Sequence, residues 1–180
     1  GFSMASAAAQ YGHMELVQML IQEQGFAMDR NVMWNAARGG NLELIRWLRG
    51  EGCNWGAEAC KGAAERGRLG ILQWLRGHGC RWDDGTCNVA VLNGQLETLR
   101  WAHENGCEWS AQTCFYAAYG GHLEILQWLR AKGCPWVAAT CTAAVEGGHV
   151  ETLRWAREHG CPWKAATRDR AAAELGYTDD

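Results

Sequence analysis

The side chains best suited to chemistry in this 180-residue sequence are its nine cysteines and six histidines. The cysteines include pairs spaced C-x6-C, such as Cys53 and Cys60, and His122 and His149 stand near two further pairs. Zinc motifs usually space their thiolate and imidazole ligands by only two to four residues. Arg68 also occupies the place of these histidines in another part of the sequence, and a metal ligand could not be exchanged for arginine. We therefore expect small buried thiols, no metal and no cofactor.

The arginines are a second set of candidate functional side chains. A basic stripe can bind phosphates, so anion or nucleic-acid binding is one alternative function. Glutamates, however, stand three residues before several of these arginines, a spacing that forms surface ion pairs on a helix. The net charge of −3 also argues against a protein built to bind nucleic acid or an anionic membrane. We expect a solvated outer face made by Arg46, Arg49, Arg76, Arg100, Arg130, Arg154 and Arg157.

No catalytic motif is present. The sequence has no G-x-S-x-G, no H-E-x-x-H and no phosphate-binding glycine loop. No apolar run approaches the roughly 18 residues that a membrane span needs. We therefore predict a protein that is not an enzyme, has no catalytic residues, and has neither nucleic acid nor membrane as a partner.

A repeat of 27 residues positions all of these side chains. C-x-W triplets begin at Cys53, Cys80, Cys107, Cys134 and Cys161, each 27 residues after the one before. A fixed period of this size indicates a solenoid. The predicted repeats, within one domain, are 1–25, 26–52, 53–79, 80–106, 107–133, 134–160 and a partial cap at 161–180.

Each repeat predicts two short helices, at positions 5–13 and 17–25 counted from its first cysteine. Alanine at position 11 and Cys or Met at position 8 give the first helix an apolar face. Asp29, Asp83 and Ser110, at position 4, are suitable N-caps. Gly-Gly at positions 14 and 15, and Gly at 27, are expected to end the helices with positive φ. Tryptophans at positions 3 and 22 recur with the same period, so we predict that both ladders lie in the core, whereas Trp34 stands off both.

The repeat also indicates whether the cysteines form disulfides or stay reduced. Equivalent helices in neighbouring repeats should lie about 8–10 Å apart, whereas a disulfide needs Cα atoms within about 7 Å. Disulfides between equivalent cysteines are therefore not expected, and an odd count leaves at least one thiol unpaired. Reduced thiols indicate an intracellular, cytoplasmic protein. A cysteine-based metal or redox protein remains an alternative function.

The second helices carry a family resemblance. Gly148-His149-Val150-Glu151, followed by Leu153, resembles the second half of an ankyrin repeat, as do residues 121–126 and 12–17. An ankyrin repeat has about 33 residues with a β-turn element, and the missing residues here fall between the helix pairs. The sequence is similar to the ankyrin-like Cys-Pro-Trp repeats of protein arrays in algae, oomycetes and giant DNA viruses. The resemblance implies an all-α solenoid of stacked helix-turn-helix repeats that lacks the β-hairpin fingers.

Positions 9, 10 and 13 of the first helix vary from repeat to repeat, so they are the candidates for partner binding. In the ankyrin family the first helices line the concave face, and the resemblance places these positions there. Aromatic, Arg and Leu side chains on one face are typical of protein-binding hot spots. We predict a monomeric, non-enzymatic protein–protein interaction scaffold that binds another protein through Trp34, Arg38, Lys61, Glu65, Asn88, Leu92, Phe115, Tyr116, Tyr119 and Glu146.

Within that set, the sharpest candidate is the group formed by Leu92, Phe115, Tyr116 and Tyr119. The alternative for this group is local packing, with Phe115 filling a gap between repeats.

Overall fold

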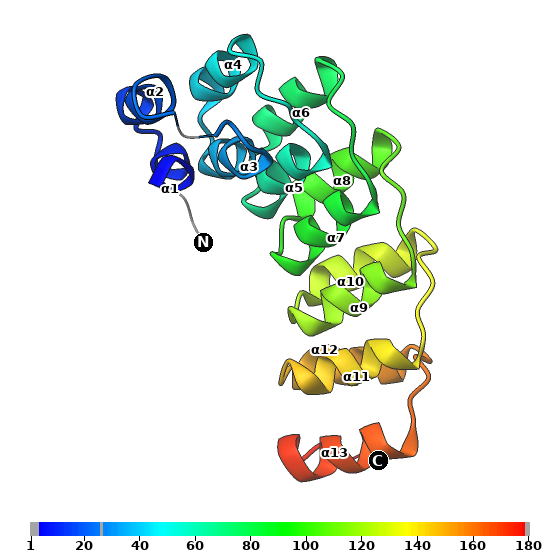
Figure 1. Cartoon of the computed structure of the whole chain (residues 1–180). Coiled ribbons are helices and arrows are strands. Elements are labelled where there is room, and N and C mark those ends of the chain that lie inside the picture. The colour runs from blue at the N-terminus through cyan, green and yellow to red at the C-terminus, as the bar shows by residue number, and fades with distance from the viewer. Residues whose placement is uncertain (1–3, 26, 179–180) are drawn as a thin grey trace. The chain divides into compact units, whose positions relative to one another are not determined.

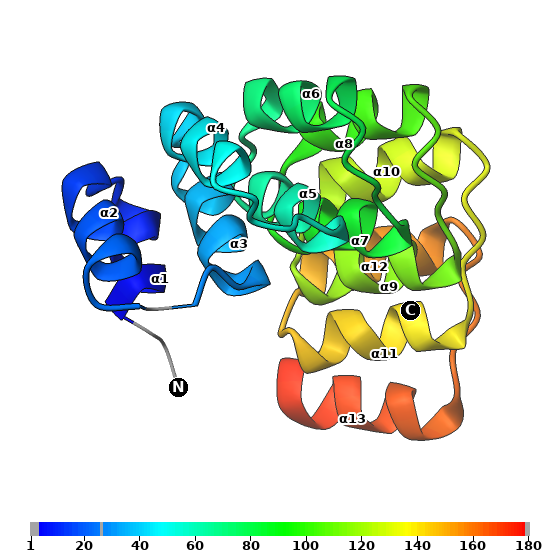
Figure 2. The same cartoon turned by 45° about the horizontal axis from the view of Figure 1, so that its top comes forward.

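The computed structural model describes residues 4–25 and 27–178, and these residues form thirteen helices and no strand (Figures 1 and 2). The chain separates into an N-terminal unit, Gly1–Ala90 with Glu97–Cys107, and a C-terminal unit, Val91–Leu96 with Glu108–Asp180. The predicted all-α fold without β-hairpins is confirmed for the part of the chain that the structure describes. No helix there has both the length and the apolar character to cross a membrane.

The N-terminal unit is built from pairs of antiparallel helices, as helix-turn-helix repeats predict. Among the first three pairs, the first helix of one pair packs on the first helix of the next, so that α1 contacts α3 and α3 contacts α5. α1, α3 and α5 also pack on their own second helices. The pairs are α1 (Met4–Tyr11) with α2 (Met14–Gln22), α3 (Arg30–Gly39) with α4 (Leu42–Gly50), α5 (Ala57–Glu65) with α6 (Leu69–Gly77), and α7 (Asp84–Leu92) with α8 (Leu96–Glu104).

The C-terminal unit follows the same plan. Figures 1 and 2 both show α9, α11 and α13 as successive layers, and these first helices contact one another in that order. The second helices α10 and α12 also touch each other. The elements are α9 (Ala111–Tyr119), α10 (Leu123–Ala131), α11 (Ala138–Glu146), α12 (Val150–Glu158) and α13 (Ala165–Leu175).

The helix bounds agree with the predicted positions. From α5 to α12, every first helix spans positions 5–13 of its repeat and every second helix spans positions 17–25. The carboxylate of Asp29 caps α3 by accepting from the Asn31 and Val32 amides at 2.9 and 3.0 Å. The Ser110 hydroxyl caps α9 in the same way. The carboxylate of Asp83, the third predicted cap, pairs with Lys61.

The core lies between the two helix layers and consists of small residues on the first helices and aliphatic residues on the second. The alanine at position 11 is fully buried in each repeat, which allows neighbouring first helices to approach closely. The aliphatic residue at position 20 is equally buried. These two sets are Ala36, Ala63, Ala90, Ala117, Ala144 and Ala171, and Ile45, Leu72, Leu99, Leu126 and Leu153.

The prediction that both paired glycines adopt positive φ is wrong for the first glycine of the pair. Gly148 has φ of 75°, whereas Gly147 has an ordinary φ of −78°. A Cβ at Gly147 would lie 2.4 Å from the Tyr119 carbonyl oxygen, closer than real Cβ contacts allow. The second glycine therefore supplies the turn conformation, and the first supplies the space in which α9 and α11 approach.

All nine cysteines are free and buried, as predicted. The thiol at position 1 of a repeat does more than fill space, because it lies against the carbonyl oxygen at position 4 of the preceding repeat. Cys80 Sγ is 3.4 Å from the Gly56 oxygen, and Cys134 Sγ is 3.4 Å from the Ser110 oxygen. Each connector is therefore tied to the start of the preceding first helix by a thiol hydrogen bond.

The prediction that both tryptophan ladders lie in the core is wrong. The tryptophans at positions 3 and 22 are half-buried and meet each other edge to face at the rim of the core. Trp109 and Trp128 illustrate the contact, with ring centres 5.6 Å apart at 87°. The equivalent contacts are Trp55 with Trp74, Trp82 with Trp101, and Trp136 with Trp155.

Candidate protein-binding surface

In the N-terminal unit, two of the candidate binding residues form an ion pair between neighbouring first helices. Arg38 of α3 donates from Nε to Glu65 Oε1 of α5 at 2.8 Å, and from Nη1 to Gln10 Oε1 of α1 at 3.0 Å. The two charged side chains are only 17% and 19% exposed. Arg38 and Glu65 therefore bridge three successive first helices and leave little of their charge for a partner.

Lys61 is engaged in a similar way. Its ammonium lies 3.0 Å from Asp83 Oδ2 and 3.5 Å from Glu58 Oε1. Partial burial alone would lower the pKa of Lys61, but the Asp83 and Glu58 carboxylates outweigh it and raise the pKa above its ordinary value. Asn88, the next candidate, is only 9% exposed. These residues contribute more to repeat-to-repeat contact than to the free surface.

Trp34 stands off the tryptophan ladders and is half-buried on α3. The guanidinium of Arg38 lies 5.1 Å from its ring centre, which is within the range of a cation–π contact. Its ring and backbone pass so close to Gly62 that a Cβ there would lie 2.5 Å from the Trp34 oxygen. Trp34 also lines a pocket of about 590 Å³ together with Asp29, Arg30, Asn31 and Glu58.

In the C-terminal unit, the three aromatic candidates form a cluster on one face of α9. The rings of Phe115 and Tyr119 lie parallel, 6.2 Å apart at 8°, and Phe115 meets Tyr116 edge to face at 5.5 Å. Tyr119 is 46% exposed, and Phe115 and Tyr116 are half-buried. We call Phe115, Tyr116 and Tyr119 the α9 aromatic cluster. Tyr119 is its most exposed ring, and tyrosine is among the residues in which protein-binding hot spots are enriched.

The two remaining candidates lie elsewhere in the C-terminal unit. Leu92 is half-buried, and its carbonyl oxygen is hydrogen-bonded to His122 Nε2 at 3.0 Å. This contact shows how His122 serves the fold, since it ties the turn before α10 to the end of α7. Glu146, at the end of α11, pairs with Arg170 of α13 at 3.6 Å.

The arginine stripe is only in part a solvated face. Of the predicted Glu–Arg pairs, the structure shows Glu97 with Arg100 at 3.4 Å. Four other arginines lie over the tryptophan that opens the next repeat, with the guanidinium carbon 4.2–4.6 Å from the ring centre. These pairs, which the helical pattern did not reveal, are Arg49 with Trp55, Arg76 with Trp82, Arg130 with Trp136 and Arg157 with Trp163.

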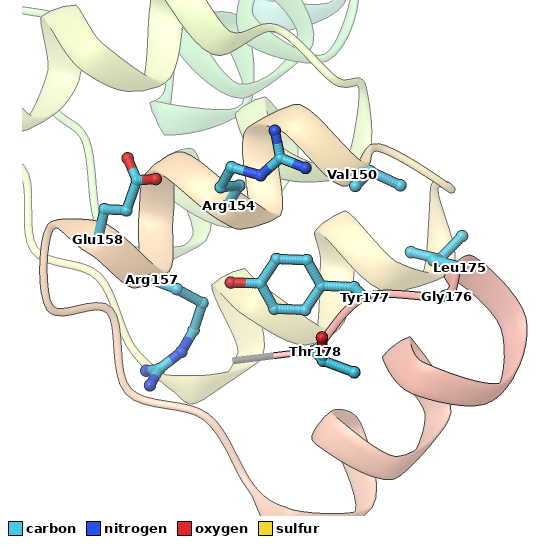
Figure 3. A pocket seen from close by; sticks show the side chains of 8 residues that line it. All are labelled: Val150, Arg154, Arg157, Glu158, Leu175, Gly176, Tyr177 and Thr178. Atoms are coloured by element: carbon cyan, nitrogen blue, oxygen red, sulfur yellow. The ribbon is translucent and has the colours of Figure 1, made fainter. Parts of the chain in front are cut away.

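A pocket of about 560 Å³ opens beside α12 (Figure 3). The segment after α13 closes one side of it, and Figure 3 shows the Tyr177 ring next to α12, near Arg154 and Arg157. Tyr177 also meets Trp163 edge to face at 5.9 Å and 80°. In this last repeat Tyr177 therefore takes the place that the second-helix tryptophan has in the others.

The described part of the chain contains no metal site with three protein ligands. Among residues 4–25 and 27–178, no group of three or more His, Cys, Asp or Glu side chains lies close enough together to hold an ion.

Comparisons with known proteins agree with this architecture. Models of ankyrin repeats match residues 5–86 and 87–130, which together exceed half of the chain. The crystal structure of the human ASB11 ankyrin repeat domain has a TM-score of 0.65 and 17% sequence identity, covering 89% of this chain and 85% of that one. No curated protein matches the sequence. Ankyrin repeats generally mediate protein–protein interactions, and this chain belongs to the ankyrin-repeat family.

Proposed function

We propose that the chain is a non-enzymatic scaffold that binds another protein through its first-helix surface, with the α9 aromatic cluster at the centre of contact. The observation that carries the proposal is the exposure of Tyr119 next to the preordered rings of Phe115 and Tyr116. Rigid aromatic side chains lose little conformational entropy on binding and bury a large area, so they are efficient anchors.

The contacts of the other candidates support placing the centre on α9. Arg38, Glu65 and Lys61 are occupied by ion pairs between repeats, so a partner would have to compete with those pairs. No such ion pair holds the rings of the α9 aromatic cluster. Arg38, Lys61, Glu65 and Asn88 then act mainly as contacts between repeats. Leu92 and Glu146, in the same unit as the cluster, are candidates for the edge of the interface, and Trp34 is a separate candidate in the N-terminal unit.

We also propose that the chain is monomeric and lies in the cytoplasm. Nine buried thiols remain reduced in such a compartment. Alternative binding through the arginine stripe receives less support, because five of its guanidinium groups lie over tryptophan rings.

The test compares the parent chain with a Tyr116→Glu/Tyr119→Glu variant as bait in a quantitative pull-down from lysate of the source cells. A matched control, Gln73→Glu/Gln127→Glu, adds the same charge at exposed positions of the second helices. We expect a partner that the parent and the control retain and that the α9 variant loses at least tenfold. Equal capture by all three chains, each with an unchanged circular dichroism spectrum, would refute the aromatic site.

A further inference from the structure

The buried cysteines form close pairs between positions that are not equivalent in the repeat. Cys60 lies on the buried face of α5, and Cys80 lies in the connector that opens the following repeat. Their sulfur atoms are 3.5 Å apart, and neither residue is accessible to solvent. The wide spacing between equivalent cysteines of neighbouring repeats does not hold for this pair, because its members stand 20 residues apart rather than 27.

The same pairing recurs along the chain. In three more cases the sulfur of a position-8 cysteine lies 3.8–3.9 Å from the carbonyl oxygen of the cysteine 20 residues later. The pairing accounts for the odd number of cysteines, because Met33 occupies the place 20 residues before Cys53. Cys53 is therefore the one cysteine without a position-8 partner, and the other pairs are Cys87 with Cys107, Cys114 with Cys134, and Cys141 with Cys161.

We propose that Cys60 and Cys80 are a site of oxidative modification, at which a peroxide converts the two thiols into a disulfide that fastens α5 to the connector of the next repeat. The pair needs to close from 3.5 Å to the S–S bond length of about 2.05 Å. The two sulfur atoms therefore have to approach by roughly 1.5 Å.

The reaction balances with one peroxide molecule per pair. The Cys80 thiolate attacks one peroxide oxygen, the O–O bond breaks, and a sulfenic acid and hydroxide form. Cys60 then loses its proton, its sulfur attacks the Cys80 sulfur, and the sulfenic oxygen leaves as water. In total the two thiols lose two protons and two electrons, which reduce one hydrogen peroxide molecule to two water molecules.

The surroundings of the pair support this order of events. The contact with Cys60 lowers the pKa of the Cys80 thiol, and the Arg76 guanidinium contributes to the lowering while burial opposes it. The contact with Cys80 and burial both raise the pKa of the Cys60 thiol. Cys80 also lies in a connector between exposed residues, Gly79 and Arg81. The proposal therefore requires that this connector open transiently to admit a small uncharged peroxide to Cys80.

The experiment treats the purified, reduced chain with hydrogen peroxide under native conditions. Remaining thiols are then alkylated in denaturant, and peptides are mapped by mass spectrometry without reduction. We expect the peptide containing Cys60 to be joined to the peptide containing Cys80, with Cys53 fully alkylated, and the joining to be reversed by dithiothreitol. Two alkylated thiols at Cys60 and Cys80, or joining of either to Cys53 at equal frequency, would overturn the proposal.

Two single-residue variants test the pairing separately, so that the result does not depend on whether one of them folds. Cys60→Ala should remove the joined peptide and leave Cys80 without a disulfide. Met33→Cys gives Cys53 a partner in the same register, and peroxide should then join position 33 to Cys53. If a folded Met33→Cys chain keeps both thiols free while the parent forms no Cys60–Cys80 disulfide, the register argument is refuted.

Discussion

The guanidinium carbon of Arg130 lies 4.2 Å from the centre of the Trp136 ring, across the connector that joins two repeats. Arg130 Nη1 also donates to the Cys134 carbonyl oxygen at 2.5 Å. A single side chain thus satisfies a connector carbonyl and covers the tryptophan of the next repeat, and the same arrangement recurs at Arg49, Arg76 and Arg157.

Replacing Arg130 should therefore destabilise the fold. A cation–π contact contributes roughly 0.5–1 kcal/mol, and a hydrogen bond from a charged donor roughly 1.5 kcal/mol, so we expect Arg130→Ala to lower the free energy of unfolding by about 2–2.5 kcal/mol. Urea unfolding followed by circular dichroism measures the change. Arg154→Ala, at an exposed position of α12, should stay within about 0.5 kcal/mol. Equal losses in the two variants would contradict a specific role for Arg130.

The same Gly→Ala change should have opposite effects at two helical sites of the N-terminal unit. A Cβ at Gly62 of α5 would meet the Trp34 backbone oxygen at 2.5 Å, whereas a Cβ at Gly70 of α6 would meet nothing within 4 Å. We expect Gly62→Ala to lower the free energy of unfolding by about 1–3 kcal/mol through overpacking. Gly70→Ala should raise it by about 0.5 kcal/mol, because alanine favours the helix. Thermal melts of both variants beside the parent decide this, and a gain in stability at Gly62 would be the contrary result.

Substitution of a buried residue of the first helices should cost more stability than substitution of a residue on the binding surface. Ala90 is fully buried on α7, so Ala90→Leu should cost about 1–3 kcal/mol. Tyr119→Ala removes a side chain that is 46% exposed and should cost less than about 1 kcal/mol. Differential scanning calorimetry compares the two, and equal losses of melting temperature would contradict the division between frame and binding surface.

The ion pair between α3 and α5 should show a measurable coupling. A double-mutant cycle with Arg38→Ala and Glu65→Ala is expected to give about 0.5–1 kcal/mol at low salt, in the range of partly exposed pairs. The coupling should decrease in 1 M salt, where the screening length is about 3 Å. A cycle between Arg38 and Glu58, which lacks this contact, should give a value near zero.

The sequence predicted the helix bounds because a strict period repeats the same evidence several times. Position 11 alanine, position 20 leucine and the glycine at position 27 recur in register, so chance substitutions in one repeat do not shift the assignment. The caps at Asp29 and Ser110 followed from residue type alone.

The rim position of the tryptophans and the contacts between repeats could not be predicted, because they depend on how neighbouring repeats pack against each other. A period identifies the residues that belong to the frame but does not distinguish a core tryptophan from one at the rim, which explains the error for Trp55 and its equivalents. The Arg130–Trp136 contact crosses a non-helical connector, and the Arg38–Glu65 pair joins residues 27 apart. Neither spacing appears in the helical pattern of a single repeat.

The thiol and backbone contacts between repeats also bear on how this chain acquires its structure. The hydrogen bonds between repeats described above join residues only 20 to 30 positions apart, from Cys60 with Cys80 to Leu92 with His122. Closing such short loops costs little entropy, and proteins rich in local contacts fold quickly. As the chain leaves the ribosome, each connector can therefore dock on the helix pair made just before it.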